Sequence, residues 1–136
     1  MLIIDSNIWA YYFDKDAPEH PHVVGMVEEA LRSDRVVINT VVIIEVAHFL
    51  IKNLGPVVGS SKLEVFLGFP FTVADLDYDL TLKAVEFLAE YSHTGIGGRD
   101  ATILATARAL RLNRIITHDE AFKRVDWLEV IDPIPR

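Results

Sequence analysis

Four acidic residues lie within or directly beside apolar runs of the sequence. They are Asp5 after residues 2–4, Glu45 inside residues 41–47, Asp100 at the start of residues 100–107, and Asp119 just beyond residues 115–117. A carboxylate in apolar surroundings is costly unless it is paired, hydrogen-bonded or bound to a cation. Because hard divalent cations prefer oxygen ligands, four such positions predict one site that folding assembles around an ion. This pattern is typical of a metal-dependent nuclease.

The ion that this pattern predicts is Mg²⁺ or Mn²⁺. Neighbouring carboxylates repel one another by on the order of several kcal/mol per pair, so a cluster without a cation would take up protons. A bound cation removes this repulsion, polarises a phosphoryl oxygen and lowers the pKa of a bound water. The sequence has no cysteine and no obvious histidine pair, which favours these hard ions over zinc.

Each of the four acids also has a purely structural interpretation. Asp5 could cap a turn after a strand, and Glu45 could be exposed or paired with a buried arginine. Asp100 suits the N-cap of a helix, and Asp119 could cap a short helix over residues 120–124. Capping is compatible with metal binding, so the four positions carry more information together than singly.

Length and composition predict one domain, residues 1–136, with a core of its own. The absence of cysteine excludes disulfides and thiolate metal sites. No basic segment with a cleavage site follows Met1, and the longest apolar stretch, residues 41–51, is too short to span a bilayer. We therefore expect a cytoplasmic protein with no membrane segment.

The formal net charge of −7, taken alone, disfavours nucleic acid as a partner. Many of the basic residues nevertheless lie between or just outside two of the acids. These are Arg99, Arg108, Arg111, Arg114, Lys123 and Arg124. A bound cation would also cancel part of the negative charge of the site. Charge therefore decides neither for nor against a nucleic-acid substrate.

Apolar runs of strand type alternate with segments of helical periodicity. The expected strands are residues 2–5, 36–38, 71–73, 114–117 and 128–131. The expected helices are 9–13, 23 to about 33–34, 39 or 40 to about 50, 62–67, 80–91 capped by Asp79, and 100–112, with loops at 14–22, 54–61 and 93–98. This alternation predicts a three-layer α/β/α sandwich with a mostly parallel central sheet. Such sheets bind ligands at the carboxyl ends of their strands, where the four acids could converge.

The segments around the acids resemble the motifs of the PIN domain, the nuclease fold found in VapC-type toxins. Leu2-Ile3-Ile4-Asp5-Ser6-Asn7 is similar to the first-strand motif of that family, and residues 41–50 match its helical glutamate. Residues 99–107 are similar to its third acidic motif, and Thr117-His118-Asp119-Glu120-Ala121-Phe122 resembles its late Thr-x-Asp-x-x-Phe pattern. The resemblance covers essentially the whole chain, with the motifs in order.

The resemblance implies a Mg²⁺- or Mn²⁺-dependent endoribonuclease acting on single-stranded or structured RNA. The catalytic and metal-binding residues that it implies are Asp5, Glu45, Asp100 and Asp119. The residues that it implies beside them, orienting the carboxylates or contacting substrate, are Asn7, Thr117 and Arg99. His118 occupies a position that the pattern leaves open, and we expect it to be an exposed bystander.

Partners follow from the same resemblance. Toxin-like members usually form homodimers and are inhibited by an antitoxin that occupies the region of the active site. An apolar surface near the site, including Trp9 or Phe49, could hold an antitoxin helix in a groove. Because the family also contains nucleases of RNA processing and decay, a toxin is a narrower expectation than a nuclease.

Three other interpretations are weaker. A non-catalytic binding module would not need all four acids, and none is missing. A phosphotransfer enzyme with Asp5 as nucleophile would need a second aspartate at the position of Asn7. The run Asp75-x-Asp77-x-Asp79 is similar to a calcium-binding loop, but Leu80 stands where that loop requires glycine.

Overall fold

The computed structural model describes residues 1–33 and 35–136. Its centre is a five-stranded sheet in the order β3-β2-β1-β4-β5, with neighbouring strands paired in parallel. The strands are β1 (Leu2–Ile4), β2 (Val36–Asn39), β3 (Phe71–Ala74), β4 (Arg114–Ile116) and β5 (Glu129–Ile131). The predicted parallel sheet is therefore confirmed. The strand order reverses at β1, so the crevice between the ends of β1 and β4 is where a sheet of this kind binds its ligand.

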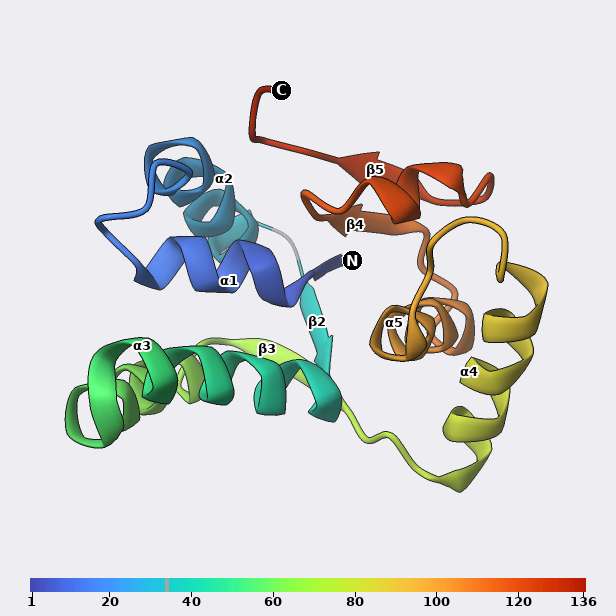
Figure 1. The fold of residues 1–136 in the computed structure, drawn as a ribbon, viewed down its shortest axis with the longest axis horizontal. Coiled ribbons are helices and arrows are strands. Elements are labelled where there is room, and N and C mark those ends of the chain that lie inside the picture. The colour runs from blue at the N-terminus through green and yellow to red at the C-terminus, as the bar shows by residue number, and fades with distance from the viewer. Residues whose placement is uncertain (34) are drawn as a thin grey trace.

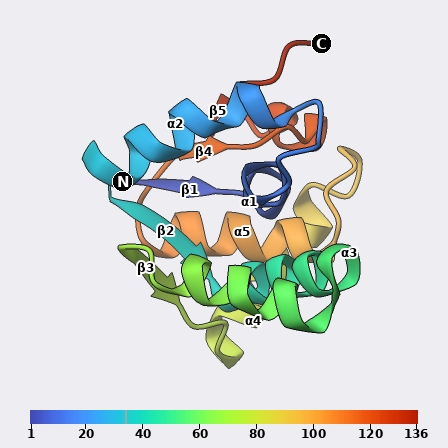
Figure 2. The same cartoon turned by 90° about the vertical axis from the view of Figure 1, so that its left-hand side faces the viewer.

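Helices cover both faces of this sheet. They are α1 (Ser6–Phe13), α2 (His20–Ser33), α3 (Thr40–Leu67), α4 (Tyr78–Glu90) and α5 (Gly98–Ala109), with the short 3-10 helix η1 (Glu120–Arg124) before β5. In Figure 1, α1, α2 and α3 lie on one side of the strands, and α4 and α5 lie on the other. Figure 2 looks onto the first of these layers. The predicted α/β/α sandwich is confirmed. The helix expected to end near residues 33–34 ends at Ser33, and residue 34 lies outside the described residues.

Helix α5 is buried along most of its length because it lies between the sheet and α4 (Figure 1). Residues 101–107 are all buried, with small side chains such as Ala101 and Ala105 alternating with large ones such as Leu104. Small residues allow the flanking elements to approach closely, and the large ones fill the remaining space. Only the first turn of α5 reaches the polar edge of the sheet, so Asp100 is carried at the end of a rigidly packed helix.

Helix α3 is a hairpin of two helical arms rather than one straight helix. Gly55 separates the arms with φ 84° and ψ 166°, a conformation that favours glycine, and Pro56 begins the second arm, where its missing N–H costs little. A Cβ atom built on Gly59 would lie 2.6 Å from the carbonyl oxygen of Leu50, so the arms pack backbone against backbone. The prediction of a loop over residues 54–61 was wrong, because a single glycine reverses the chain.

The hairpin also bears on the expectation that no segment spans a membrane. By length and composition alone, the 28 residues of α3 are long and apolar enough to cross a bilayer. The reversal at Gly55 divides them into two arms, and neither arm reaches the roughly 20 residues that a spanning helix requires. The helix therefore consists of two shorter arms joined at Gly55.

Two predicted helix caps were wrong in position. Helix α4 begins at Tyr78 and is capped by Asp77, whose carboxylate accepts a hydrogen bond of 2.8 Å from the N–H of Leu80; Asp79 lies inside the first turn. Helix α5 begins at Gly98 after the N-cap Gly97, which makes Asp100 its third residue. The expected short helix at 120–124 is present as η1, with Asp119 as its cap.

Candidate active site

Asp5 follows β1 directly and is almost completely buried, with 5% of its surface exposed. Its Oδ1 accepts a hydrogen bond of 2.7 Å from the N–H of Ser6, which caps α1. Its Oδ2 accepts a bond of 2.7 Å from the hydroxyl of Thr117, which follows β4. The turn after β1 and the neighbouring strand β4 together fix the orientation of this carboxylate.

Thr117 also holds Asp119 in place. The Thr117 hydroxyl oxygen accepts a hydrogen bond of 3.0 Å from the N–H of Asp119, and the Asp119 carboxylate accepts one of 3.0 Å from the N–H of Ala121. Because β1 and β4 are adjacent in the sheet, Asp5 and Asp119 leave it at the point where the strand order reverses. The predicted capping role of Asp119 is thus observed together with its place beside Asp5.

Glu45 reaches the same region from α3. Its side chain is 19% exposed, and its Oε2 lies 3.3 Å from a guanidinium nitrogen of Arg99, which is 72% exposed. The alternative that Glu45 pairs with a buried arginine is therefore wrong, because its partner is mostly in solvent. An exposed arginine screens the carboxylate only weakly and leaves its charge available to a cation.

Asp100 faces the site from the first turn of α5. Its carboxylate accepts a hydrogen bond of 3.2 Å from the N–H of Gly97. This closes the first turn of the helix back onto its cap and holds the carboxylate near the positive end of the helix dipole.

The four acids line one cavity of about 330 Å³. Its other lining residues are Ser6, Asn7, Gly97, Gly98 and Arg99. The Oδ1 atom of Asn7 is buried and has no hydrogen-bond partner within the described part of the chain. Of the seven residues to which the sequence assigns a catalytic, metal-binding or supporting role, six line the cavity, and the seventh, Thr117, lies behind Asp5. The groups in this lining that could ligate a cation are oxygen atoms, one of them an unused acceptor, which suits a hydrated hard cation.

Burial raises the pKa of three of the carboxylates, and their neighbouring negative charges add to the effect. Burial, the largest cause, raises the pKa of Asp5 from 3.8 to about 7; the hydrogen bonds from Thr117 and Ser6 oppose this shift, and the charges of Asp100 and Glu45 add to it. Burial also raises the pKa of Glu45, against the attraction of Arg99. It raises the pKa of Asp100 as well, against the bond from Gly97. The site holds carboxylates that solvent does not stabilise in their charged form.

The fit to a metal ion is chemical rather than geometric. Among residues 1–33 and 35–136, no three His, Asp or Glu side chains lie close enough together to hold one ion between them. The predicted metal cluster is therefore not formed by the side chains as they stand. The donor set still consists of oxygen atoms alone, and it contains a carboxylate, that of Asp5, that gains from any positive charge placed beside it.

Sequence reasoning overlooked Ser6, Gly97 and Gly98. Ser6 donates to Asp5 through its N–H, and its hydroxyl lowers the pKa of Glu45. Ser6 could have been predicted from its position between Asp5 and Asn7 in the sequence. Gly97 and Gly98 could have been predicted from their position shortly before Asp100. Glycines there leave the entrance to the cavity free of side chains.

The structure contradicts the expectations for His118 and Trp9. His118 does not line the cavity; its ring nitrogen Nδ1 lies 2.9 Å from Asp132, and its side chain is only 22% exposed, so it is not the exposed bystander expected. Trp9 is fully buried and donates a hydrogen bond to the carbonyl oxygen of Ile4. It cannot belong to a surface that holds a partner.

A second cavity adjoins the site between α1 and α3. It has a volume of about 400 Å³ and shares Ser6, Asn7, Glu45 and Arg99 with the acidic cavity. The residues that line this cavity but not the acidic one are Ala10, Tyr11, His48, Phe49, Lys52 and Asn53. A partly apolar groove therefore leads directly to the carboxylates.

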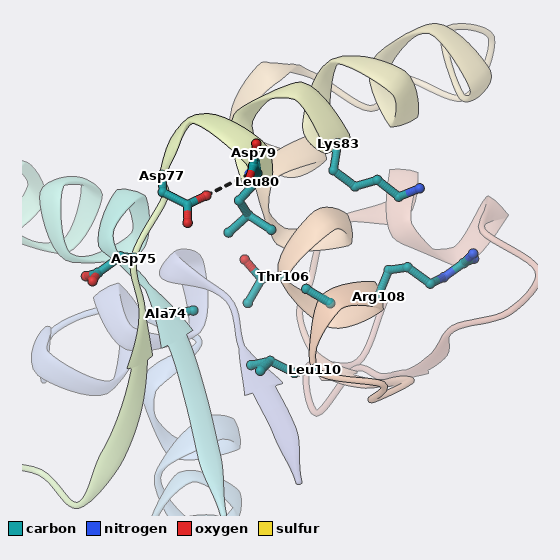
Figure 3. A pocket seen from close by; sticks show the side chains of 10 residues that line it. Ala74, Asp75, Asp77, Asp79, Leu80, Lys83, Thr106, Arg108 and Leu110 are labelled. Atoms are coloured by element: carbon teal, nitrogen blue, oxygen red, sulfur yellow. Dashed lines mark hydrogen bonds between the residues drawn. The ribbon is translucent and has the colours of Figure 1, made fainter.

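A third cavity, of about 410 Å³, lies away from the four acids, between the end of β3, the start of α4 and the end of α5 (Figure 3). Its lining is mostly apolar, with Asp75, Asp77 and Asp79 on one side and Lys83 and Arg108 on the other (Figure 3). Figure 3 shows the carboxylate of Asp77 turned toward the backbone of Leu80, which it caps.

Comparison with known proteins agrees with this architecture. A family profile described as PIN domain matches residues 2–128. The chain belongs to the PIN domain family. It is 28% identical, over 151 aligned positions, to Ribonuclease VapC2 of Methanocaldococcus jannaschii, and the alignment covers 96% of this chain and 93% of that protein.

Solved structures of similar fold include those of VapC20 and VapBC2. VapC20 of Mycobacterium tuberculosis, described as a Sarcin-Ricin loop cleaving toxin, superposes with a TM-score of 0.78 at 20% identity, covering 96% of this chain and 98% of that one. VapBC2 of Rickettsia felis, bound to a DNA fragment from its promoter, gives a TM-score of 0.76 at 22% identity, with 96% and 97% coverage. At these identities the likeness establishes that the PIN domain of this chain has their fold.

Proposed function

We propose that this protein is a metal-dependent endoribonuclease and the toxin of a VapBC-type toxin–antitoxin pair. The observation that carries the proposal is the convergence of Asp5, Glu45, Asp100 and Asp119 on one cavity at the switch point of a PIN-domain sheet. The relative named as a ribonuclease, and the toxins among the structures of similar fold, support the same activity.

The four carboxylates would hold Mg²⁺ or Mn²⁺. When bound, such an ion polarises a phosphoryl oxygen and lowers the pKa of a water. Thr117 and Ser6 hold the two oxygens of Asp5, so its carboxylate cannot turn away from the cavity. The unpartnered Oδ1 of Asn7 can accept a hydrogen bond from a water in the cavity, which would orient that water.

Arg99 is the residue suited to contact the substrate. Its guanidinium is mostly exposed, lines the acidic cavity and forms an ion pair with Glu45. Arginine donates paired hydrogen bonds to phosphate oxygens. An RNA phosphate approaching Arg99 would therefore enter the cavity at the carboxylates, despite the net negative charge of the chain.

The decisive experiment is cleavage of a labelled RNA panel by the purified protein with Mg²⁺ or Mn²⁺, and again with excess EDTA. Asp5→Asn, prepared identically, is the test variant, and Asp77→Asn is the control that removes one charge elsewhere. We expect metal-dependent cutting that Asp5→Asn loses and Asp77→Asn retains. Equal cutting by all three proteins, or cutting that survives EDTA, would refute the proposed site.

The toxin assignment requires a partner, and the groove between α1 and α3 is the place for an antitoxin helix. Phe49 and Tyr11 supply apolar surface there, and the groove opens onto the four acids, so a helix lying in it would also block the cavity. Expression of the chain should arrest growth of its host, and co-expression of the cognate antitoxin should relieve the arrest. Unimpaired growth, with RNA cleavage intact in the test tube, would leave a nuclease that is not a toxin.

The proposal includes a cytoplasmic homodimer. Two helices present exposed apolar side chains that a second subunit could cover. Those on α3 include Ile44, Val57, Val58 and Val65, and those on α4 include Tyr78, Leu82 and Val85. Sedimentation of the purified protein would establish whether two copies associate.

A further inference from the structure

The two helices that carry Glu45 and Asp100 are joined by a buried polar network. Asn39 ends β2, is 1% exposed, and caps α3 by accepting a hydrogen bond of 3.0 Å from the N–H of Val42. Its side-chain Nδ2 donates to the hydroxyls of Thr102 and Thr106 on α5, each at 3.2 Å. One amide thus bonds the start of α3 to the middle of α5.

Every polar atom of this network has a partner. The hydroxyl of Thr102 donates to the carbonyl oxygen of Arg99 at 2.6 Å, and the hydroxyl of Thr106 donates to the carbonyl oxygen of Thr102 at 2.8 Å. Buried polar groups stabilise a fold less than apolar packing does, but a fully paired network fixes the register of the elements that it joins. The network therefore fixes the position of α3 relative to α5.

This network ends at the candidate active site. The chain of hydrogen bonds runs from Asn39 through Thr102 to the backbone of Arg99, and the side chain of Arg99 pairs with Glu45 on α3. Asp100 is the next residue after Arg99. The N-terminal parts of α3 and α5 are thus connected twice, once inside the core and once at the cavity.

We propose that Asn39 and Thr102 are positioning residues, which set the placement of Glu45 relative to Asp100 across the acidic cavity. This proposal rests on the nuclease function proposed above. Without the Asn39–Thr102 bond, the first turn of α5 would be free to shift against α3, and Asp100 would no longer have a fixed position relative to Glu45. Thr106 bonds to the same amide one turn farther from the site, so it contributes to stability but not to this alignment.

The chain offers a matched pair of variants for the test, Thr102→Val and Thr106→Val. Both are isosteric changes on the buried face of α5, and each removes one hydrogen bond from the same amide. We expect similar losses of stability in urea denaturation. We expect kcat to fall by about 10-fold in Thr102→Val with KM little changed, which is the size of effect found for residues that orient metal ligands.

Thr106→Val should retain kcat close to that of the wild type, and Thr102→Ser, which keeps the hydroxyl, should restore it. Calorimetric titration with Mn²⁺ provides a second measurement that does not need RNA: Thr102→Val should bind Mn²⁺ about 10-fold more weakly than Thr106→Val does. Equal kcat and equal Mn²⁺ affinity in the two valine variants would overturn the positioning role. If the wild type cut no RNA, the nuclease proposal would fail, and the difference in Mn²⁺ affinity alone would decide whether Thr102 positions the carboxylates.

Discussion

Two groups of carboxylates border cavities in this molecule, and they have little in common beyond their residue type. Asp5, Glu45, Asp100 and Asp119 come from four distant segments and line one cavity in which they are buried or half-buried. Asp75, Asp77 and Asp79 come from one short segment and line one side of a cavity of similar size, but all three are exposed (Figure 3).

The difference comes from where the backbone places each group. The first group lies at the ends of β1 and β4 and in α3 and α5, where packed elements hold charge away from water. The second lies on the connection from β3 to α4, where water solvates each carboxylate and Asp77 serves as a helix cap. Charge that is costly to bury is a stronger sign of a binding site than the number of acids in a stretch of sequence.

The largest effect expected from this contrast is on catalysis. Asp100→Asn should lower kcat/KM for RNA by at least about 100-fold, since losing even an outer partner of a metal ligand costs 10- to 100-fold. Asp77→Asn, which removes the same charge from the exposed group, should leave kcat/KM unchanged. Initial rates on one RNA substrate at saturating Mn²⁺ would measure both. A comparable loss in the two variants would show that the two groups do not differ in function.

A smaller effect concerns stability and pH in metal-free protein. Because the pKa of Asp5 is raised from 3.8 to about 7 on folding, the native state binds a proton there that the unfolded state has released. The proton on Asp5 stabilises the native state fully below pH 3.8, and this stabilisation is lost as the pH rises to about 7. The free energy of unfolding of the wild type should therefore fall over this window relative to that of Asp5→Asn. The fall in the free energy of unfolding of the wild type relative to that of Asp5→Asn is on the order of 4 kcal/mol across the window.

Urea denaturation in EDTA at several pH values would measure this difference. Asp77→Asn should parallel the wild type, because Asp77 is exposed. Curves for the wild type and Asp5→Asn that run parallel from pH 4 to about 7 would mean that burial does not shift the titration of Asp5 as the structure indicates.

The smallest effect lies within the exposed group. Asp77→Ala removes the N-cap of α4 and should lower the free energy of unfolding by about 1 kcal/mol. Asp75→Ala, which removes no cap, should change it by less than about 0.5 kcal/mol. Urea denaturation at pH 7 resolves the two values, and both variants should cut RNA as the wild type does. An equal loss of stability would contradict the capping role of Asp77.

Much of the site could be predicted from the sequence because strand ends are marked locally. The apolar run before Asp5 and the run before Thr117 each signal a buried strand, and parallel strands bring their carboxyl ends to one edge. The same reasoning failed at the helix starts. Asp77 and Asp79 are equally capable caps, and only the extended backbone at Asp77 selects it.

The hairpin in α3 and the network of Asn39 could not be predicted, for different reasons. Gly55 and Pro56 signal a break in a helix, but the length of the break depends on how the two arms pack, which Gly59 permits through its contact with Leu50. Asn39 was expected only as a possible cap. Its bonds to Thr102 join residues 63 positions apart, and no local pattern encodes such a pairing.

The hydrogen bond between Thr117 and Asp5 joins residues separated by 112 positions. During synthesis on the ribosome, Asp5 therefore emerges long before the threonine that orients it, and Asp119 emerges later still. A nascent chain holds no assembled site until β4 has left the exit tunnel and paired with β1. For the nuclease proposed above, which would be surrounded by the RNA of the ribosome, this order delays activity until β4 has been made and has paired with β1.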